Sequence, residues 1–156
     1  MGVTGAGKTT IGRLLAKELG WEFADADDFH SAANKEKMSR GIALDDADRE
    51  PWLEAIRAAM LQWSAAERNV VLACSALKSS YRERLEIGPE VKFVYLKGSY
   101  ETIYQRLLSR HGHFATEKIL SSQFEALEEP ADAIVVYIGK SPEEIVGEIR
   151  ERLKLS

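Results

Sequence analysis

Residues 2–9 combine glycines, a lysine and a threonine at a spacing that can hold phosphate groups. The segment GVTGAGKT fits the pattern Gly-x-x-x-x-Gly-Lys-Thr of a P-loop. Glycines let backbone N–H groups turn toward phosphate oxygens, and the helix that follows adds the positive end of its dipole. A plain glycine-rich turn before a helix is the alternative. The residues predicted to cradle a nucleotide are Gly2, Thr4, Gly5, Ala6, Gly7, Lys8, Thr9 and Thr10.

Two acidic residues follow this loop and can complete a site for phosphoryl transfer. We expect Lys8 to reach the β- and γ-phosphates of ATP and Thr9 to offer its hydroxyl to Mg²⁺. Asp25 and Asp27 lie at the end of the predicted strand WEFAD, and positions i and i+2 of extended chain face opposite sides. Asp25 is therefore predicted to hold the water shell of the metal, and Asp27 to accept the proton of an attacking hydroxyl. A solvated acidic turn that caps the next helix would explain the same residues.

Other classes of P-loop protein fit the sequence less well. A GTPase needs Asn-Lys-x-Asp late in the chain, whereas NKEK at 34–37 lacks the aspartate and comes early. Motor and transport ATPases carry an aspartate at the end of a later apolar strand, whereas VVLAC ends in Cys74 and is followed by Ser75. These differences favour a kinase of a small molecule, with ATP and Mg²⁺ as cofactors.

The overall composition indicates one domain and excludes several kinds of partner. A chain of 156 residues is long enough for one hydrophobic core, and we see no linker or repeat, so 1–156 is predicted to be a single domain. The net charge of −4 provides no basic field for nucleic acid. No apolar stretch approaches the roughly 20 residues of a membrane span, and no signal-peptide pattern is visible. We therefore expect a cytoplasmic protein without nucleic-acid or membrane partners, in agreement with the single cysteine.

Predicted strands and helices alternate along the chain. Apolar runs rich in β-branched and aromatic residues predict strands at 21–25, 69–74, 91–98 and 133–139. Apolar spacing and cap signals predict helices from the P-loop to Gly20, at 31–41, 46–63, 75–85, 100–110 and 117–127, and after Ser141. This alternation is typical of an α/β fold with three α/β/α layers around a parallel sheet.

The strand that normally precedes a P-loop is not visible in this sequence. Only Met1 stands before Gly2, although in this fold the preceding strand is central and has neighbours on both sides. Without it we expect unpaired backbone groups and a void in the core. A nucleotide- or metabolite-binding protein with little catalytic activity is therefore an alternative to an active kinase.

Several blocks in a fixed order resemble the gluconokinase family of P-loop kinases. They are GVTGAGKTT, DADDFH, NKEKMSRGIALDDADREPWL, CSALKSSYRERL, YLKGSYETI, RLLSRHGHF and SQFEALEEP, which span Gly2 to about Pro130. The resemblance implies transfer of the γ-phosphate of ATP to the 6-hydroxyl of D-gluconate. It also implies an adenylate-kinase-like fold, a mobile helical lid and a homodimer. A kinase of another small hydroxy acid, such as shikimate, is the nearest alternative, although this chain has CSAL where that reading would need a glycine-rich turn.

The resemblance places the acceptor beside the second and third of these blocks. It implies a position near the sugar for His30 and on the substrate side for Lys37 and Arg49. A sugar acid needs a cation for its carboxylate, and an arginine can bind one in a bidentate manner. We expect Arg49 to be that cation, with Lys37 and Arg82 as helpers. A solvated helical face explains Lys37 equally well.

The remaining predicted site residues come from the loop after the third strand and from the lid. Ser75 and Lys78 are predicted to face the substrate, although a plain strand-to-helix turn would also explain them. The predicted lid spans about 106–127, with Gly112 as its pivot. Within it, Arg106 and Arg110 are expected to neutralise phosphoryl charge, and His113 to lie near the substrate. Ser141 and Pro142 are expected near adenine, with helix capping as the alternative. The predicted catalytic residues are Lys8, Asp27 and Arg110.

Overall fold

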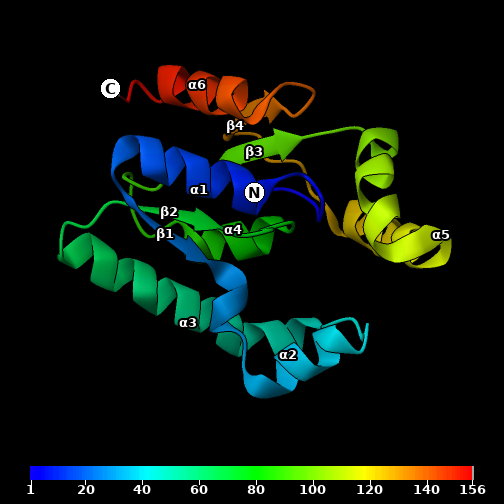
Figure 1. Ribbon diagram of the computed structural model, residues 1–156. Coiled ribbons are helices and arrows are strands. Elements are labelled where there is room, and N and C mark those ends of the chain that lie inside the picture. The colour runs from blue at the N-terminus through cyan, green and yellow to red at the C-terminus, as the bar shows by residue number, and fades with distance from the viewer. Residues whose placement is uncertain (156) are drawn as a thin grey trace.

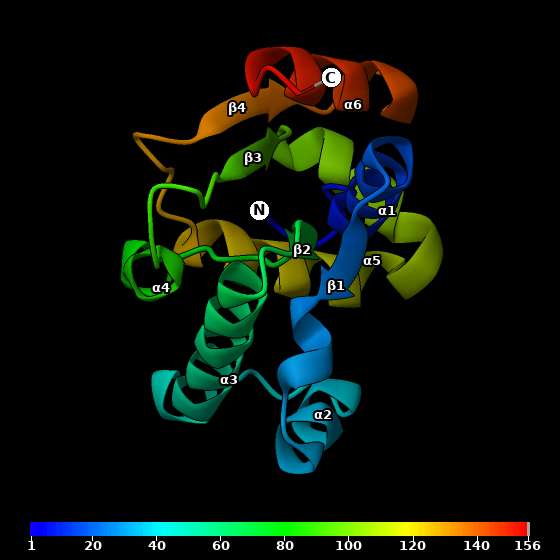
Figure 2. The same ribbon diagram turned by 90° about the vertical axis from the view of Figure 1, so that its left-hand side faces the viewer.

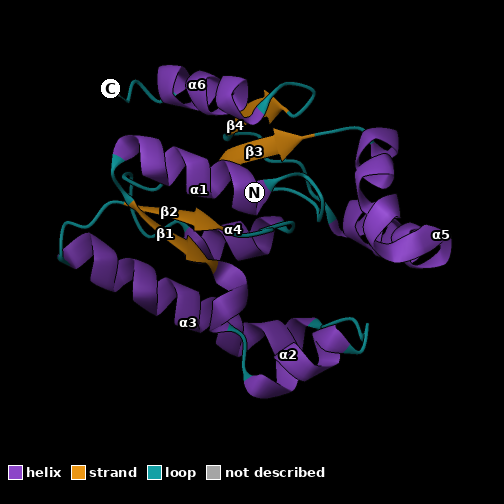
Figure 3. Ribbon diagram, in the orientation of Figure 1, coloured by secondary structure: helices purple, strands orange, loops and turns teal. Residues whose placement is uncertain are grey.

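The computed structural model describes residues 1–155, in which strands and helices alternate (Figure 1). The strands are β1 (Glu22–Asp25), β2 (Val70–Ala73), β3 (Val94–Lys97) and β4 (Ile134–Tyr137). The helices are α1 (Lys8–Leu19), α2 (Ala32–Ser39), α3 (Asp46–Ala65), α4 (Ser79–Leu85), α5 (Tyr100–Ala126) and α6 (Pro142–Arg152), with a 3₁₀ helix η1 (Ala26–Phe29) after β1. Each predicted strand and helix is present, and two predicted helices are joined within α5 (Figure 3).

Side-chain caps explain where α3 and α6 begin. The Asp45 carboxylate accepts a hydrogen bond from Asp48 N, and the Asp48 carboxylate accepts one from Asp45 N. At α6, Ser141 Oγ accepts from Glu144 N, and Pro142 occupies the first turn. These contacts satisfy N–H groups that the start of a helix leaves without an internal partner. Both starts are therefore determined by residues within four positions of each other.

The strands pair in parallel, and the helices cover them on two sides. β1 pairs with β2, and β3 pairs with β4. α1 and α6 pack together against one side, whereas α3 and α4 lie on the other (Figure 2). The predicted three-layer α/β architecture is confirmed. This arrangement brings the carboxyl ends of β1 and β2 to the side of the molecule where the P-loop enters α1.

β2 and β3 face each other without pairing, and the N-terminal residues lie between them (Figure 2). The amino group of Met1 donates to Val94 O at 2.6 Å, and the carbonyl of Met1 accepts from Leu96 N at 2.9 Å. Gly2 N donates to Ser75 O, in the loop between β2 and α4, at 3.2 Å. Beside Met1 is a cavity of about 480 Å³, lined largely by apolar side chains of β2, β3, α1 and α3. Within residues 1–155 no strand lies at this position, and backbone hydrogen bonds of Met1 and Gly2 connect β3 to the loop after β2.

The helix α5 breaks at Gly112, whose φ of 74° and ψ of 173° are not helical. This conformation favours glycine, so the predicted pivot coincides with a break in the backbone. Beyond the break, Thr116 and Leu120 are fully buried. Only 109–115 forms a continuous exposed run, in which Phe114 is 92% exposed. This projecting segment lies within the lid of 106–127 predicted from the sequence. No helix within residues 1–155 is both long and apolar enough to cross a membrane.

Candidate active site

The P-loop lies tightly against α5 and leads into the N-terminus of α1. Gly5 has a φ of 81°, and a Cβ at this position would lie 2.9 Å from Leu107 Cγ. Gly7, with a φ of 96°, is the N-cap of α1 and makes no side-chain cap. The first N–H groups of α1 therefore point out of the helix without a side-chain acceptor at the cap, which is the arrangement that binds phosphate.

Lys8 lies over the loop that it is predicted to serve. Its Nζ donates to Val3 O at 3.0 Å. Desolvation lowers the pKa of Lys8, while the carboxylates of Asp27 and Asp25 oppose this change. The structure thus brings the lysine of the P-loop and both predicted acidic residues into one electrostatic site.

The two aspartates have different surroundings, as their spacing in the sequence predicts. Asp25 Oδ2 accepts from Thr9 Oγ1 at 3.3 Å, and Asp25 Oδ1 accepts from Asp27 N at 3.0 Å and so caps η1. Asp27 makes no such cap. Desolvation, followed by the negative charge of Asp25, raises the pKa of Asp27. Asp25 is therefore tied to the threonine of the P-loop, whereas Asp27 is a carboxylate whose affinity for a proton is increased.

His30 is held rigidly at the end of η1. Its ring stacks on Trp52 at a centroid distance of 4.6 Å and an interplanar angle of 8°. Trp52 Nε1 in turn donates to Ala26 O at 2.7 Å. Burial lowers the pKa of His30, Asp27 opposes this change and Arg49 adds to it. The imidazole therefore remains neutral over a wider pH range than a histidine in water.

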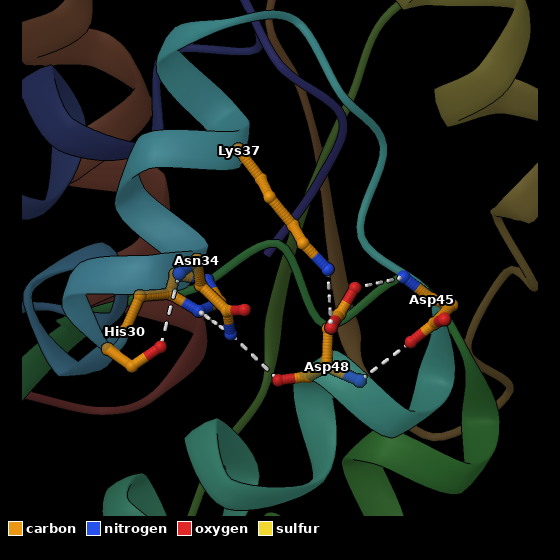
Figure 4. A network of polar contacts seen from close by, with 6 residues as sticks. His30, Asn34, Lys37, Asp45 and Asp48 are labelled. Atoms are coloured by element: carbon orange, nitrogen blue, oxygen red, sulfur yellow. Dashed lines mark hydrogen bonds and ion pairs between the residues drawn. The ribbon is translucent and has the colours of Figure 1, made fainter.

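Polar contacts connect His30 to the start of α3 (Figure 4). Asn34 Nδ2 lies 3.4 Å from His30 Nδ1 and donates to Asp48 O at 2.8 Å. Lys37 Nζ makes an ion pair with Asp48 Oδ1 at 2.9 Å. The predicted helper Lys37 is thus already paired with a carboxylate of the protein. Asn34 is a positioning residue whose role the sequence did not reveal.

Arg49 and Lys78 meet at Tyr81, on the same side of the molecule. Arg49 Nη1 donates to Tyr81 Oη at 3.2 Å, and both cations lie within 6 Å of the Tyr81 ring. Lys78 Nζ makes an ion pair with Asp46 Oδ1 at 3.0 Å. Because Arg49 also affects the pKa of His30, these predicted substrate-side residues share one electrostatic environment.

Arg82 has a different environment from the one predicted. Its side chain is buried, and its guanidinium donates to Ala76 O at 2.7 Å, Leu77 O at 3.1 Å and Glu128 O at 2.7 Å. These bonds hold the turn after β2, where Ala76 has a φ of 46°. The guanidinium of Arg82 is thus engaged with backbone carbonyls of the protein, and its expected role as a helper at the acceptor carboxylate stays a prediction. Ser75, from the same turn, accepts from Gly2 N and so lies beside the P-loop.

The block SQFEALEEP supplies contacts that sequence reasoning did not assign. Gln123 Oε1 accepts from Thr4 N in the P-loop at 3.1 Å. Glu128 Oε1 accepts from Ser79 N at 2.9 Å. Both partners lie far away in the sequence, so only the fold reveals that this block supports the P-loop and the start of α4.

The remaining predicted site residues lie in two places, one beside the P-loop and the other in the exposed segment 109–115. Arg106 lies near Gly7, with its Nη1 4.0 Å from where a Cβ would be, and its Nη2 donates to Ile138 O at 3.0 Å. It therefore lies between the P-loop and Ile138, just before the turn in which Ser141 caps α6 and Pro142 is the first residue of that helix. Arg110 is exposed in the segment 109–115. His113 Nδ1 lies 2.7 Å from Tyr104 Oη, so its ring contacts α5 itself.

Oxygen ligands for Mg²⁺ are present, although the protein alone forms no closed metal site. Within residues 1–155, no group of three or more His, Cys, Asp or Glu side chains could hold a metal ion. Thr9 Oγ1 and Asp25 Oδ2 are adjacent at the P-loop. Mg²⁺ commonly binds one or two protein oxygens and completes its shell with water and substrate phosphates. These two residues fit that mode of binding.

Known proteins resemble this chain over nearly its whole length. The family model described as shikimate kinase matches residues 4–154. A probable gluconokinase of Mus musculus is 44% identical, over 99% of this chain and 95% of that protein. A sugar kinase from Janibacter sp. HTCC2649 superposes with a TM-score of 0.88 at 42% identity, over 100% of this chain and 92% of that one. A gluconokinase from Sinorhizobium meliloti 1021 superposes with a TM-score of 0.81 at 36% identity, over 99% of this chain and 93% of that one.

The solved structure of a shikimate kinase is less similar to the chain than these sugar kinases are. The enzyme from Aquifex aeolicus superposes with a TM-score of 0.60 at 21% identity, over 99% of this chain and 93% of that one. Sequence and structure together therefore place the chain much nearer to the gluconokinases. The chain is a P-loop kinase that belongs to the gluconokinase family, within the wider group matched by the shikimate kinase model.

Proposed function

We propose that this protein transfers the γ-phosphate of ATP to the 6-hydroxyl of D-gluconate. The observation that carries the proposal is the juxtaposition of a P-loop lysine, an aspartate with a raised pKa and a set of cations on α3 and α4, in a chain 44% identical to a probable gluconokinase. Lys8 and the first N–H groups of α1 bind the phosphates, and Asp27 accepts the proton of the acceptor hydroxyl. Arg49 binds the carboxylate of the acceptor.

Mg²⁺ and the exposed segment 109–115 complete the proposed site. Thr9 and Asp25 would hold the ion, which neutralises charge on the transferring phosphate when it is bound. Arg106 orients the phosphates from its position beside Gly7, and Arg110 approaches them from the projecting segment. Ser141 and Pro142 form part of the adenine side. His30, Ser75, Lys78 and His113 lie toward the acceptor in this proposal.

The test is ADP formation with a panel of acceptors in the presence of ATP and Mg²⁺. Turnover with D-gluconate and none with shikimate or neutral polyols is the expected result. Turnover with another hydroxy acid alone would refute the proposed substrate.

We also propose a cytoplasmic homodimer, as the family resemblance implies. Light scattering after size exclusion at several concentrations tests the dimer.

The cavity between β2 and β3 favours a second candidate function, namely binding of nucleotide with little catalysis. The P-loop follows directly from the two residues that bridge this cavity. In this alternative the unfilled space beside Met1 weakens the support of the P-loop from the sheet, so that ATP binds but is positioned poorly. Stabilisation by ATP against heat, combined with absence of turnover for every acceptor, would support this alternative.

A further inference from the structure

Four side chains form a linked cluster between α3 and α4. Asp46 and Arg49 come from the first turn of α3, Lys78 is the N-cap residue of α4, and Tyr81 lies in its first turn. Tyr81 Oη accepts from Arg49 at 3.2 Å and donates to Asp46 Oδ1 at 2.5 Å, and Lys78 Nζ binds the same oxygen at 3.0 Å. The Tyr81 side chain is buried, so it fixes the spacing of the charged groups around it.

The cluster has more positive charge than its own carboxylate can neutralise. Arg49 and Lys78 contribute two positive charges and Asp46 one negative charge. The nearest acidic residues along α3 are committed elsewhere, because Asp48 pairs with Lys37 and Glu50 pairs with Arg84. One further anionic group can therefore be accommodated without an unpaired negative charge.

Asp46 is the member of the cluster that is best able to move. Its side chain is 71% exposed, whereas that of Lys78 is 33% exposed and Tyr81 is buried. An exposed ion pair contributes little free energy, typically about 1 kcal/mol or less. A ligand carboxylate that accepts from both Lys78 and Tyr81 in its place can therefore displace Asp46 at a small cost, and the released side chain returns to water.

We propose that Asp46 occupies the position of the acceptor carboxylate in the free enzyme and competes with it for Lys78, while Tyr81 positions Arg49 for the same carboxylate. This inference rests on the proposed function and deepens it, since it identifies the elements that select an acidic acceptor. Asp46 and Tyr81 thereby become specificity-determining residues. Selection works by exchange of one carboxylate for another at a preformed pair of cations.

The test compares the affinities of three variants for D-gluconate and for its neutral analogue D-glucitol. Asp46→Asn removes the competitor, so the Kd and KM for gluconate fall about two- to fivefold, the range an exposed ion pair contributes, with kcat unchanged. Lys78→Met raises both constants about tenfold or more, as expected for the loss of a hydrogen bond between charged groups. Tyr81→Phe raises them without the change in kcat that a damaged catalytic group would cause. None of the three alters the weak binding of glucitol.

Glu83→Gln is the matched control, because it removes one exposed negative charge from α4 outside the cluster. Its Kd for gluconate should stay at the wild-type value. Calorimetric titration without ATP gives the Kd independently of turnover, and thermal unfolding of each variant shows that it is folded. An unchanged or raised Kd for Asp46→Asn, or an equal gain for Glu83→Gln, would overturn the inference. If the wild type binds a different acid and not gluconate, the proposed function fails, and the same variants then test the cluster with that acid.

Discussion

At the scale of single residues, Asp27 shows how the fold prepares a side chain for proton transfer. Desolvation and the neighbouring Asp25 raise its pKa, and Lys8 and His30 only partly oppose them. A carboxylate with a raised pKa is a better base for the proton that the acceptor hydroxyl loses. Asp25 is instead the N-cap residue of η1, and its carboxylate also accepts a hydrogen bond from Thr9.

Replacing Asp27 by Asn is expected to lower kcat by about 100-fold or more, the usual contribution of a general base. In the wild type, kcat should fall as the pH drops through the raised pKa of Asp27, because the protonated side chain cannot accept a proton. The variant should lose this acidic limb of the profile. Asp28→Asn is the control, since it removes a charge from the same 3₁₀ helix. A pH profile that is the same in wild type and Asp27→Asn would contradict the assignment.

At the scale of elements, Arg82 connects α4 to the turn just before it and to Glu128, which lies 46 residues away. Its guanidinium satisfies two carbonyls of the turn after β2 and the carbonyl of Glu128. Arg82→Leu leaves these buried acceptors without a partner, and we expect a loss of about 2–4 kcal/mol in the free energy of unfolding. Chemical denaturation followed by circular dichroism measures this loss. Arg40→Ala, which removes an exposed ion pair with Glu36, should cost about 1 kcal/mol or less. Equal effects of the two changes would refute the structural role of Arg82.

The break in α5 can be tested by a second substitution at this scale. Gly112 has a φ of 74°, and a Cβ there would meet no other atom within 4 Å. Gly112→Ala therefore adds only backbone strain, about 1–3 kcal/mol for a residue held in a φ/ψ region that is nearly specific to glycine. A lower midpoint of thermal unfolding and a lower kcat are both expected if 109–115 moves during turnover. A lower midpoint with unchanged kcat would show that the break is structural and that the segment does not gate the reaction.

These elements also show what the sequence could and could not predict. The starts of α3 and α6 were predictable because their caps use residues three positions apart, and the P-loop was predictable because its chemistry is contained in eight consecutive residues. The contact between Arg82 and the carbonyl of Glu128 could not be predicted, because the two residues lie 46 positions apart. Gln123 received no role for the same reason, since its contact with Thr4 spans 119 positions. Local patterns identify groups that can react, but long-range contacts decide which of them remain available.

At the scale of the whole molecule, the sheet is divided at Met1. The amino group of Met1 is buried between β2 and β3, and desolvation lowers its pKa from 8.0 to about 5. Between these two values the unfolded chain binds a proton that the folded chain does not, so the stability of the 156-residue chain should rise as the pH increases from 5 to 8. Each pKa unit corresponds to about 1.4 kcal/mol, which makes this one of the larger pH effects expected for the protein.

Adding four apolar residues, such as Val-Val-Leu-Val, before Met1 tests this view of the molecule. At about 3.3 Å per residue, they extend about 13 Å along β2 and β3, and their side chains enter the cavity of about 480 Å³. Each buried side chain contributes about 1.5–3 kcal/mol, which exceeds the backbone entropy of about 1–2 kcal/mol that it costs. The midpoint of thermal unfolding should therefore rise by several degrees. The dependence of stability on pH between 5 and 8 should become weaker because the amine becomes an amide, which leaves the part due to the lowered pKa of His30. A Gly-Ser-Gly-Ser extension also removes the buried amine but cannot fill the cavity, so it should weaken the pH dependence to the same extent without the apolar gain. Equal midpoints for the two extended chains would show that the space between β2 and β3 does not accept a strand.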